Sequence, residues 1–169
     1  MKEHLVIVLL PLIFANCLHM LVVKRNMFPS LQIPVSARLF GENKTLRGFL
    51  LLPLLNGIIL SSLAVFFDFL LFKNTFFTGA LLGFSYMVFE LPNSFLKRRM
   101  GIAPGQGATE NRFFFTVLDK TDSAFGVVLT YWLISGISPF EAIQLFIYCS
   151  LAHFSFSGLL LLVKLKKSF

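Results

Sequence analysis

Two acidic residues in the second half of the chain, Asp119 and Asp122, have the type and spacing of a cation site. They are three positions apart, so their carboxylates share one face if this stretch is helical. Paired carboxylates can hold Mg²⁺, which prefers oxygen ligands and often shares its coordination with substrate phosphates. The structural alternative is that the two acids favour the N-terminus of a helix through its dipole.

Pairs of basic residues precede these acids. Lys44 and Arg47 are three positions apart at the start of an apolar run, and Lys97 and Arg98 follow another one. Cations at a helix N-terminus oppose the helix dipole, so Lys44 and Arg47 are favourable there if an anion such as a phosphate binds beside them. Ordinary anchoring at the membrane surface is the alternative for such residues.

A carboxylate and a glycine-rich turn complete the polar set. Glu90 ends an apolar run, where an unpaired carboxylate would be expensive to bury. Residues 104–107, Pro-Gly-Gln-Gly, can turn tightly and bring backbone N–H groups close to a ligand, although most such segments are simple turns. Together these groups have the ingredients for nucleotide triphosphate and metal chemistry at a lipid interface.

The elements that must position these residues are strongly apolar. Of 169 residues, 56% are hydrophobic and 14% are charged, and the mean hydropathy is +0.80; soluble domains usually carry about 25% charged residues. We therefore expect one all-α integral membrane domain over residues 1–169, with its first segment a membrane helix rather than a signal peptide. About five transmembrane helices are predicted, over residues 5–23, 48–72, 76–91, 123–137 and 140–163. The third and fourth are short for a span, so their final turns should come from the neighbouring loops.

The distribution of positive charge predicts the orientation. Every lysine and arginine except Lys2 and Lys73 falls in the connections at about 24–47 and 92–122 or in the C-terminal tail. Five spans place these regions on one face of the cell membrane, and the positive-inside rule makes that face cytoplasmic. The N-terminus is then outside, and the C-terminus and the active site are cytoplasmic. The net charge of +7 is explained in this way, and we expect no nucleic-acid partner.

Read in order, the polar segments resemble the motifs of a family of membrane enzymes. Residues 118–123, Leu-Asp-Lys-Thr-Asp-Ser, resemble the LDRxDS signature of the CDP-diacylglycerol synthases, and residues 94–98 and 104–107 resemble their SxxKR and PGHG motifs. Residues 41–48, Gly-Glu-Asn-Lys-Thr-Leu-Arg-Gly, are similar to the G-[DE]-N-K-T-x-R-G motif of the CDP-archaeol synthases. The small size and five predicted spans also resemble that second group.

The resemblance implies a membrane-bound, CTP-dependent cytidylyltransferase of phospholipid biosynthesis. It would convert a lipid phosphate, of the archaetidic- or phosphatidic-acid type, to a CDP-activated lipid and release pyrophosphate. Mg²⁺ would be the cofactor, and the protein would be a monomer or a homodimer. The implied catalytic residues are Asp119, Asp122 and Lys97, and the implied metal ligands are Asp119, Asp122 and Glu90. The implied substrate-binding residues are Asn43, Lys44, Arg47, Ser94, Arg98, Gly105, Gly107 and Lys120.

Three of the departures from the family's usual pattern bear on the metal site and the lipid acceptor. Glu90 stands in place of an aspartate, Asn93 in place of a glutamate and Gln106 in place of a histidine. These differences leave open the number of metal ions and the lipid acceptor. The alternative function is a non-catalytic relative that acts as a membrane transporter or assembly factor. A transporter should place polar groups near the bilayer midplane, where Asp68 and His153 are the candidates, but His153 is better explained as an interhelical hydrogen-bonding residue.

A reporter enzyme fused after Phe169 tests the predicted orientation. The reporter is one that is active only when it folds in the cytoplasm. Because the positive charges lie on the side of the C-terminus, we expect this reporter to be active. A reporter scored as external would contradict the assignment of the polar loops to the cytoplasmic face.

Overall fold

The computed structural model describes residues 1–67, 72–104, 106 and 112–162, and in this part of the chain it is all-helical, as predicted. Five long helices lie where the five apolar segments were expected, and a 3₁₀ turn η1 and a short helix α2 lie between the first two. Their bounds are α1 (Lys2–Lys24), η1 (Pro29–Leu31), α2 (Ala37–Phe40), α3 (Leu46–Phe66), α4 (Thr75–Arg99), α5 (Arg112–Ser135) and α6 (Pro139–Leu162).

The helix ends differ from the expected segments mainly around the second polar connection. Helix α4 continues through Pro92 to Arg99, and α5 already begins at Arg112. The third and fourth segments therefore do take turns from the expected loop. An interior proline removes one backbone donor but is tolerated where neighbouring helices pack around it. At the opposite end of α4, the side chain of Asn74 caps the helix by accepting a hydrogen bond from the N–H of Phe77 at 3.0 Å.

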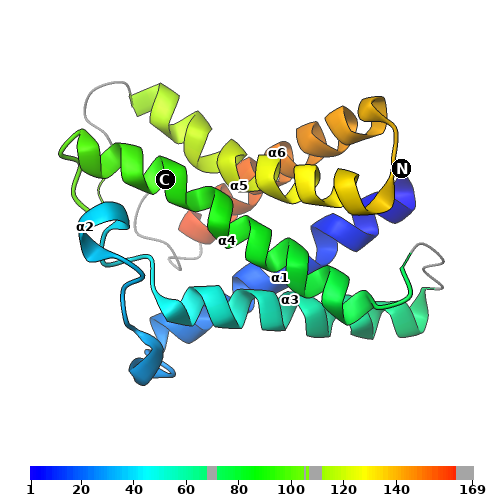
Figure 1. The fold of residues 1–169 in the computed structure, drawn as a ribbon, viewed down its shortest axis with the longest axis horizontal. Coiled ribbons are helices and arrows are strands. Elements are labelled where there is room, and N and C mark those ends of the chain that lie inside the picture. Colours follow the sequence, from blue (N-terminus) through cyan, green and yellow to red (C-terminus); the bar gives the residue numbers. More distant parts are fainter. Residues whose placement is uncertain (68–71, 105, 107–111, 163–169) are drawn as a thin grey trace.

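Helix α4 occupies the centre of the arrangement. It packs against α3 on one side and against α5 on the other, and α1 and α6 complete the bundle. Figure 1 shows that α2 and the C-terminal end of α4 lie at one end of the bundle, and that the N-terminus lies at the other. We call the first of these the polar end, because Lys44, Lys97 and Asp119 lie there.

Glycines allow α3 and α4 to approach closely. A Cβ atom added to Gly79 would lie 2.7 Å from the backbone oxygen of Asn56 and 2.9 Å from the Cα of Gly57. The fully buried Asn56 uses this proximity, since its Nδ2 donates to the carbonyl of Gly79 at 2.6 Å. Small residues and interhelical hydrogen bonds of this kind are typical of helix packing in membranes.

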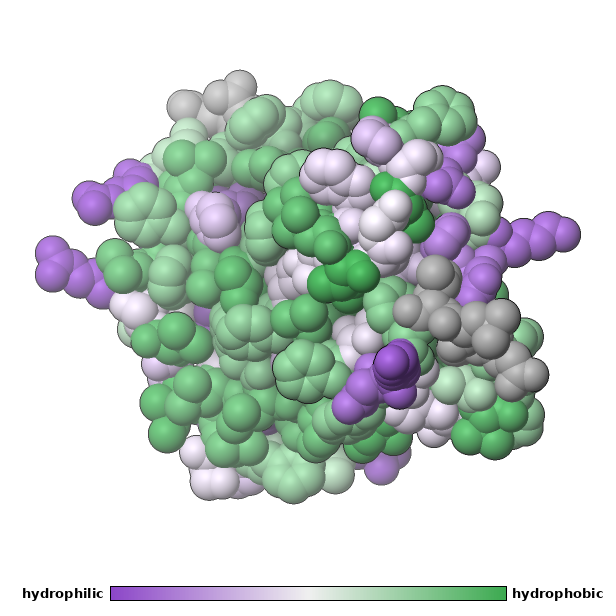
Figure 2. All heavy atoms as spheres, turned by 45° about the vertical axis from the view of Figure 1, so that its right-hand side comes forward, coloured by the Kyte–Doolittle hydropathy of each residue, from purple (hydrophilic) through white to green (hydrophobic). Residues whose placement is uncertain are grey.

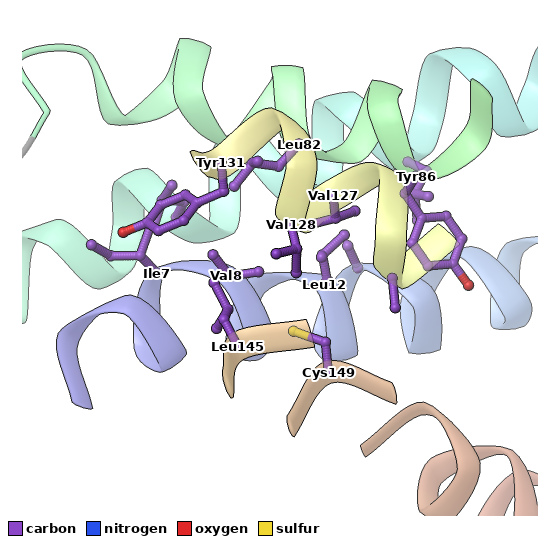
Figure 3. Close-up of a cluster of buried hydrophobic side chains, with 14 of the residues drawn as sticks. Ile7, Val8, Leu12, Leu82, Tyr86, Val127, Val128, Tyr131, Leu145 and Cys149 are labelled. Carbon is purple, nitrogen blue, oxygen red and sulfur yellow. The ribbon is translucent and has the colours of Figure 1, made fainter. Parts of the chain in front are cut away.

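The interior between the helices is filled by apolar side chains. Figure 3 shows this cluster, in which Leu12 of α1, Leu82 of α4, Val127 of α5 and Cys149 of α6 all take part. At the end away from the polar end, His4 Nδ1 and the hydroxyl of the buried Tyr131 are hydrogen-bonded at 2.7 Å, which ties α1 to α5.

The outer surface is also apolar. Apolar residues cover the middle of the face in Figure 2, and the most hydrophilic residues lie mainly toward its margins. Phe66 and Phe113 expose 82% and 84% of their surface, which would be unfavourable in water over so large an area. Within the residues that the structure describes, two helices, α1 and α3, meet the length and hydropathy expected of a membrane span. These features are those of a membrane protein; the five-span topology and its orientation remain predictions.

Gly79→Ala tests the contact between α3 and α4. The added methyl group forces the two backbones apart, and overpacking of this kind costs about 1–3 kcal/mol. We expect the midpoint of thermal unfolding in detergent to fall by roughly 5 °C. Ser62→Thr adds a methyl group at an exposed position of α3 and should leave the midpoint unchanged. Equal midpoints for Gly79→Ala and the wild type would contradict the close contact.

Candidate active site

The first polar connection is folded back onto the start of α3. Pro34 and Thr45 form an isolated antiparallel bridge, in which Val35 donates to the carbonyl of Lys44 at 2.8 Å and Leu46 donates to the carbonyl of Ile33 at 2.9 Å. These bonds fix the backbone on either side of Thr45. The Lys44 side chain is thereby held against α4.

The second polar connection approaches the first at Gly41. This glycine has a φ of +88°, and a Cβ added to it would lie 3.1 Å from Cγ of Pro104 and 3.6 Å from Cδ of Arg98. Both the positive φ and the small space favour glycine at this position. The contact brings the segment before Lys44 next to the C-terminal turns of α4.

Lys44, in the loop that precedes α3, and Glu90 of α4 form an ion pair. Each side chain retains 20% of its exposure, so the pair lies at the wall of a cavity. A carboxylate at this depth would be costly without a partner, and Lys44 supplies that partner. This pairing explains how Glu90 is accommodated at the end of an apolar run.

A second polar cluster joins α4 to α5. Nδ2 of Asn93 donates to Oδ1 of Asp119 at 2.5 Å and to Oδ2 of Asp122 at 2.9 Å. One turn later on α4, Nζ of Lys97 lies 2.5 Å from both carboxylate oxygens of Asp119. The two acids share one face of α5, as their spacing predicted, and face two polar residues that share one face of α4.

Two arginines present buried donors without acceptors. Arg47 is 4% exposed, and its Nη1 donates to the carbonyl of Met27 at 3.0 Å, but its Nε has no partner among the described residues. Nε and Nη1 of Arg98 are likewise buried with no partner in the part of the chain that the structure describes. Buried guanidinium donors are expensive to leave unpaired, so their arrangement suits an anion that accepts from them.

These groups line one cavity of about 580 Å³. Its size falls in the range of small-molecule sites. Gly105 and Gly107 lie outside the described residues. All the other predicted site residues line the cavity: Asn43, Lys44, Arg47, Glu90, Ser94, Lys97, Arg98, Asp119, Lys120 and Asp122.

The cavity also contains polar residues that the motifs did not single out as site residues. Asn16 and His19 of α1, Tyr86 and Asn93 of α4 and His153 of α6 line it. His153 is the interhelical hydrogen-bonding residue that was predicted, since its Nδ1 lies 3.1 Å from the carbonyl of Lys120 and its Nε2 lies 3.3 Å from the hydroxyl of Tyr86. The available signal for Asn16 and His19 was their polarity within an apolar run.

The carboxylate pair provides donors that fit a hard cation. Asp119 and Asp122 contribute carboxylate oxygens, and Oδ1 of Asn93 is buried beside them with no hydrogen-bond partner among the described residues. An all-oxygen donor set is what Mg²⁺ prefers. Within the described residues, no three acidic, His or Cys side chains form a metal-ligating group. Glu90 is bonded to Lys44 instead, so its role as a third metal ligand remains a prediction.

Comparison with known proteins supports the same family as the motifs. The model of the CarS-like CDP-archaeol synthase family matches residues 4–167. A CDP-archaeol synthase of Thermofilum pendens is 32% identical over 108 residues, which cover 63% of this chain and 46% of that protein, so the match spans about half of the relative's length. No solved structure matches the chain. The match of the family model over nearly the whole sequence shows that the chain belongs to the CarS-like CDP-archaeol synthase family.

Proposed function

We propose that the cavity transfers the cytidylyl group of CTP to a lipid phosphate. The observation that carries this proposal is the meeting of the unpaired guanidinium donors of Arg47 and Arg98 with the carboxylate pair Asp119 and Asp122 in one cavity. Unpaired donors suit phosphate oxygens, and paired carboxylates suit the cation that accompanies a triphosphate. The family and its relative, a CDP-archaeol synthase, support a cytidylyltransferase-type enzyme.

The two sides of the cavity suit the two substrates. Lys97 and Arg98, beside the carboxylate pair, would bind the triphosphate of CTP. Lys44 and Arg47 lie near His19 of α1, and they would bind the phosphate of the lipid. Asn43, Ser94 and Lys120 also line the cavity, and they would shape it around the nucleotide.

The reaction requires mainly positioning and charge neutralisation. An oxygen of the lipid phosphate attacks the α-phosphorus of CTP, a new P–O bond forms, and the bond to the bridging oxygen of the β-phosphate breaks to release pyrophosphate. A phosphate monoester is already ionised at neutral pH, so the attack needs no general base. Lysine and arginine side chains would stabilise the charge that moves onto the leaving pyrophosphate.

Asp119, Asp122 and the amide oxygen of Asn93 would hold Mg²⁺. The bound cation would neutralise charge on the triphosphate. Lys97 already neutralises Asp119 in the structure, and its flexible side chain can exchange the carboxylate for a phosphate oxygen when CTP arrives. The active site would face the cytoplasm, where CTP is available.

An assay with the purified protein, labelled CTP, Mg²⁺ and a panel of lipid phosphates tests the proposed function. We expect labelled CDP-lipid and pyrophosphate in equal amounts with at least one ether- or ester-linked acceptor. Asp122→Asn should reduce turnover by about 10²-fold or more, because one charge of the cation site is removed.

The matched control is Glu141→Gln, which makes a similar carboxylate-to-amide change at an exposed position at the start of α6. Its turnover should equal that of the wild type. Absence of product across the whole panel would contradict the proposed function. Full activity of Asp122→Asn would contradict the proposed role of the carboxylate pair.

A further inference from the structure

One face of α1 forms a wall of the cavity. The residues that line it recur every three or four positions from Leu9 to Val23, which is the spacing of a single helical face. Most of them are apolar. Asn16 and His19 interrupt this face with two polar side chains one turn apart.

Both side chains have unused hydrogen-bonding capacity. No hydrogen bond to either side chain is found among the described residues, whereas Tyr86, His153 and Ser94, which also line the cavity, are bonded. Polar side chains within a membrane helix are expensive and usually mark a functional site. Because they line the cavity, a ligand in the cavity can satisfy them.

His19 lies next to the ionic cluster. Its Nε2 would be 3.5 Å from a Cβ added to Gly48, the residue that follows Arg47, and its ring interacts electrostatically with Glu90, Arg47 and Lys44. Asn16 is one helical turn farther from the polar end of α1. The phosphate-binding side of the cavity therefore borders His19 first and Asn16 second.

Beyond Asn16 the cavity becomes apolar. Leu12 of α1 lies in the cluster that also contains Val127 of α5 and Cys149 of α6, as Figure 3 shows, and all three line the cavity. The order along α1 is thus an anion-binding region, two hydrogen-bonding side chains and an apolar wall. An amphiphile with a phosphate, a polar linker and a hydrocarbon chain has the same order.

We propose that Asn16 and His19 bind the oxygen atoms of the linker that joins the phosphate of the acceptor lipid to its hydrocarbon chains. This inference rests on the proposed function. The Asn16 amide and a ring N–H of His19 can donate to ether, ester or hydroxyl oxygens. A plain alkyl phosphate lacks those acceptors and would leave the donors unpaired, so the two side chains select glycerol-linked lipid phosphates over it.

Binding of two ligands with matched chain length tests this selection. The ligands are a dialkylglycerol phosphate and a plain alkyl phosphate, and their affinities for the purified protein are measured by thermal shift without turnover. The wild type should prefer the glycerol-linked ligand. Asn16→Leu and His19→Leu should each reduce that preference by roughly tenfold, the ratio expected for one hydrogen bond.

Two controls accompany these variants. His19→Gln keeps a hydrogen-bonding group and should retain most of the preference. Cys17→Leu removes a thiol from the same helix at a position that does not line the cavity, and it should retain all of it. CTP binding should be unchanged in every variant, which reports that the site is folded.

An unchanged preference in both leucine variants, or equal binding of the two ligands by the wild type, would overturn the inference. A simultaneous loss of CTP, alkyl phosphate and glycerol-linked ligand would also overturn it, because the side chains would then support the whole site. These results do not depend on catalysis. Failure of cytidylyl transfer in the activity assay would reject the proposed function separately.

Discussion

The contact between Asn93 and the two carboxylates of α5 is the interaction on which the polar end depends. Asp119 and Asp122 lie on one face and would repel each other at close range if nothing stood between them. The Asn93 amide donates to both, and Lys97 neutralises Asp119 from the next turn of α4. The same contacts hold α4 against α5, so the arrangement that creates the site also positions the helices that carry it.

A similar set of polar contacts joins α4 to the loop before α3. Lys44 neutralises Glu90, and the Arg47 side chain donates a hydrogen bond to the carbonyl of Met27. The polar end is thus held by charged contacts, whereas the middle of the bundle is held by apolar packing and by the close approach at Gly79. A site built from ionic contacts can rearrange around charged substrates while the packed part of the bundle stays fixed.

Much of this arrangement could be predicted from local sequence patterns. The five apolar segments predicted the five long helices, and the i, i+3 spacing of Asp119 and Asp122 predicted that both acids lie on one face of a helix. The position of Glu90 indicated that it needed a partner, but not that Lys44, 46 residues away, would be that partner. The apolar run of the third segment stops at residue 91, and its final turns come from the loop, as expected, because the packed neighbours of α4 allow the helix to continue past Pro92.

The residues that sequence reasoning missed depend on long-range contacts. Periodicity places Asn16 and His19 on one face of α1, but it does not show that this face meets α5 and α6 around a cavity. Asn93 was identified as a departure from the family pattern, and only the structure shows its amide between the two acids. With an amide at this position, the donor set carries one negative charge fewer than a set of three carboxylates. A cation there would therefore depend more on the phosphates of the nucleotide for its remaining charge neutralisation.

We infer that Asp119 and Asp122 hold the cation that accompanies CTP. Electron paramagnetic resonance of Mn²⁺, used in place of Mg²⁺, measures the affinity of the cation site directly in the purified protein with CTP present. Mn²⁺ should bind the wild type, and its affinity should fall about tenfold or more in Asp119→Asn, because a negatively charged ligand is lost. Equal Mn²⁺ affinity in the wild type and Asp119→Asn would contradict the role of Asp119 as a ligand of the cation.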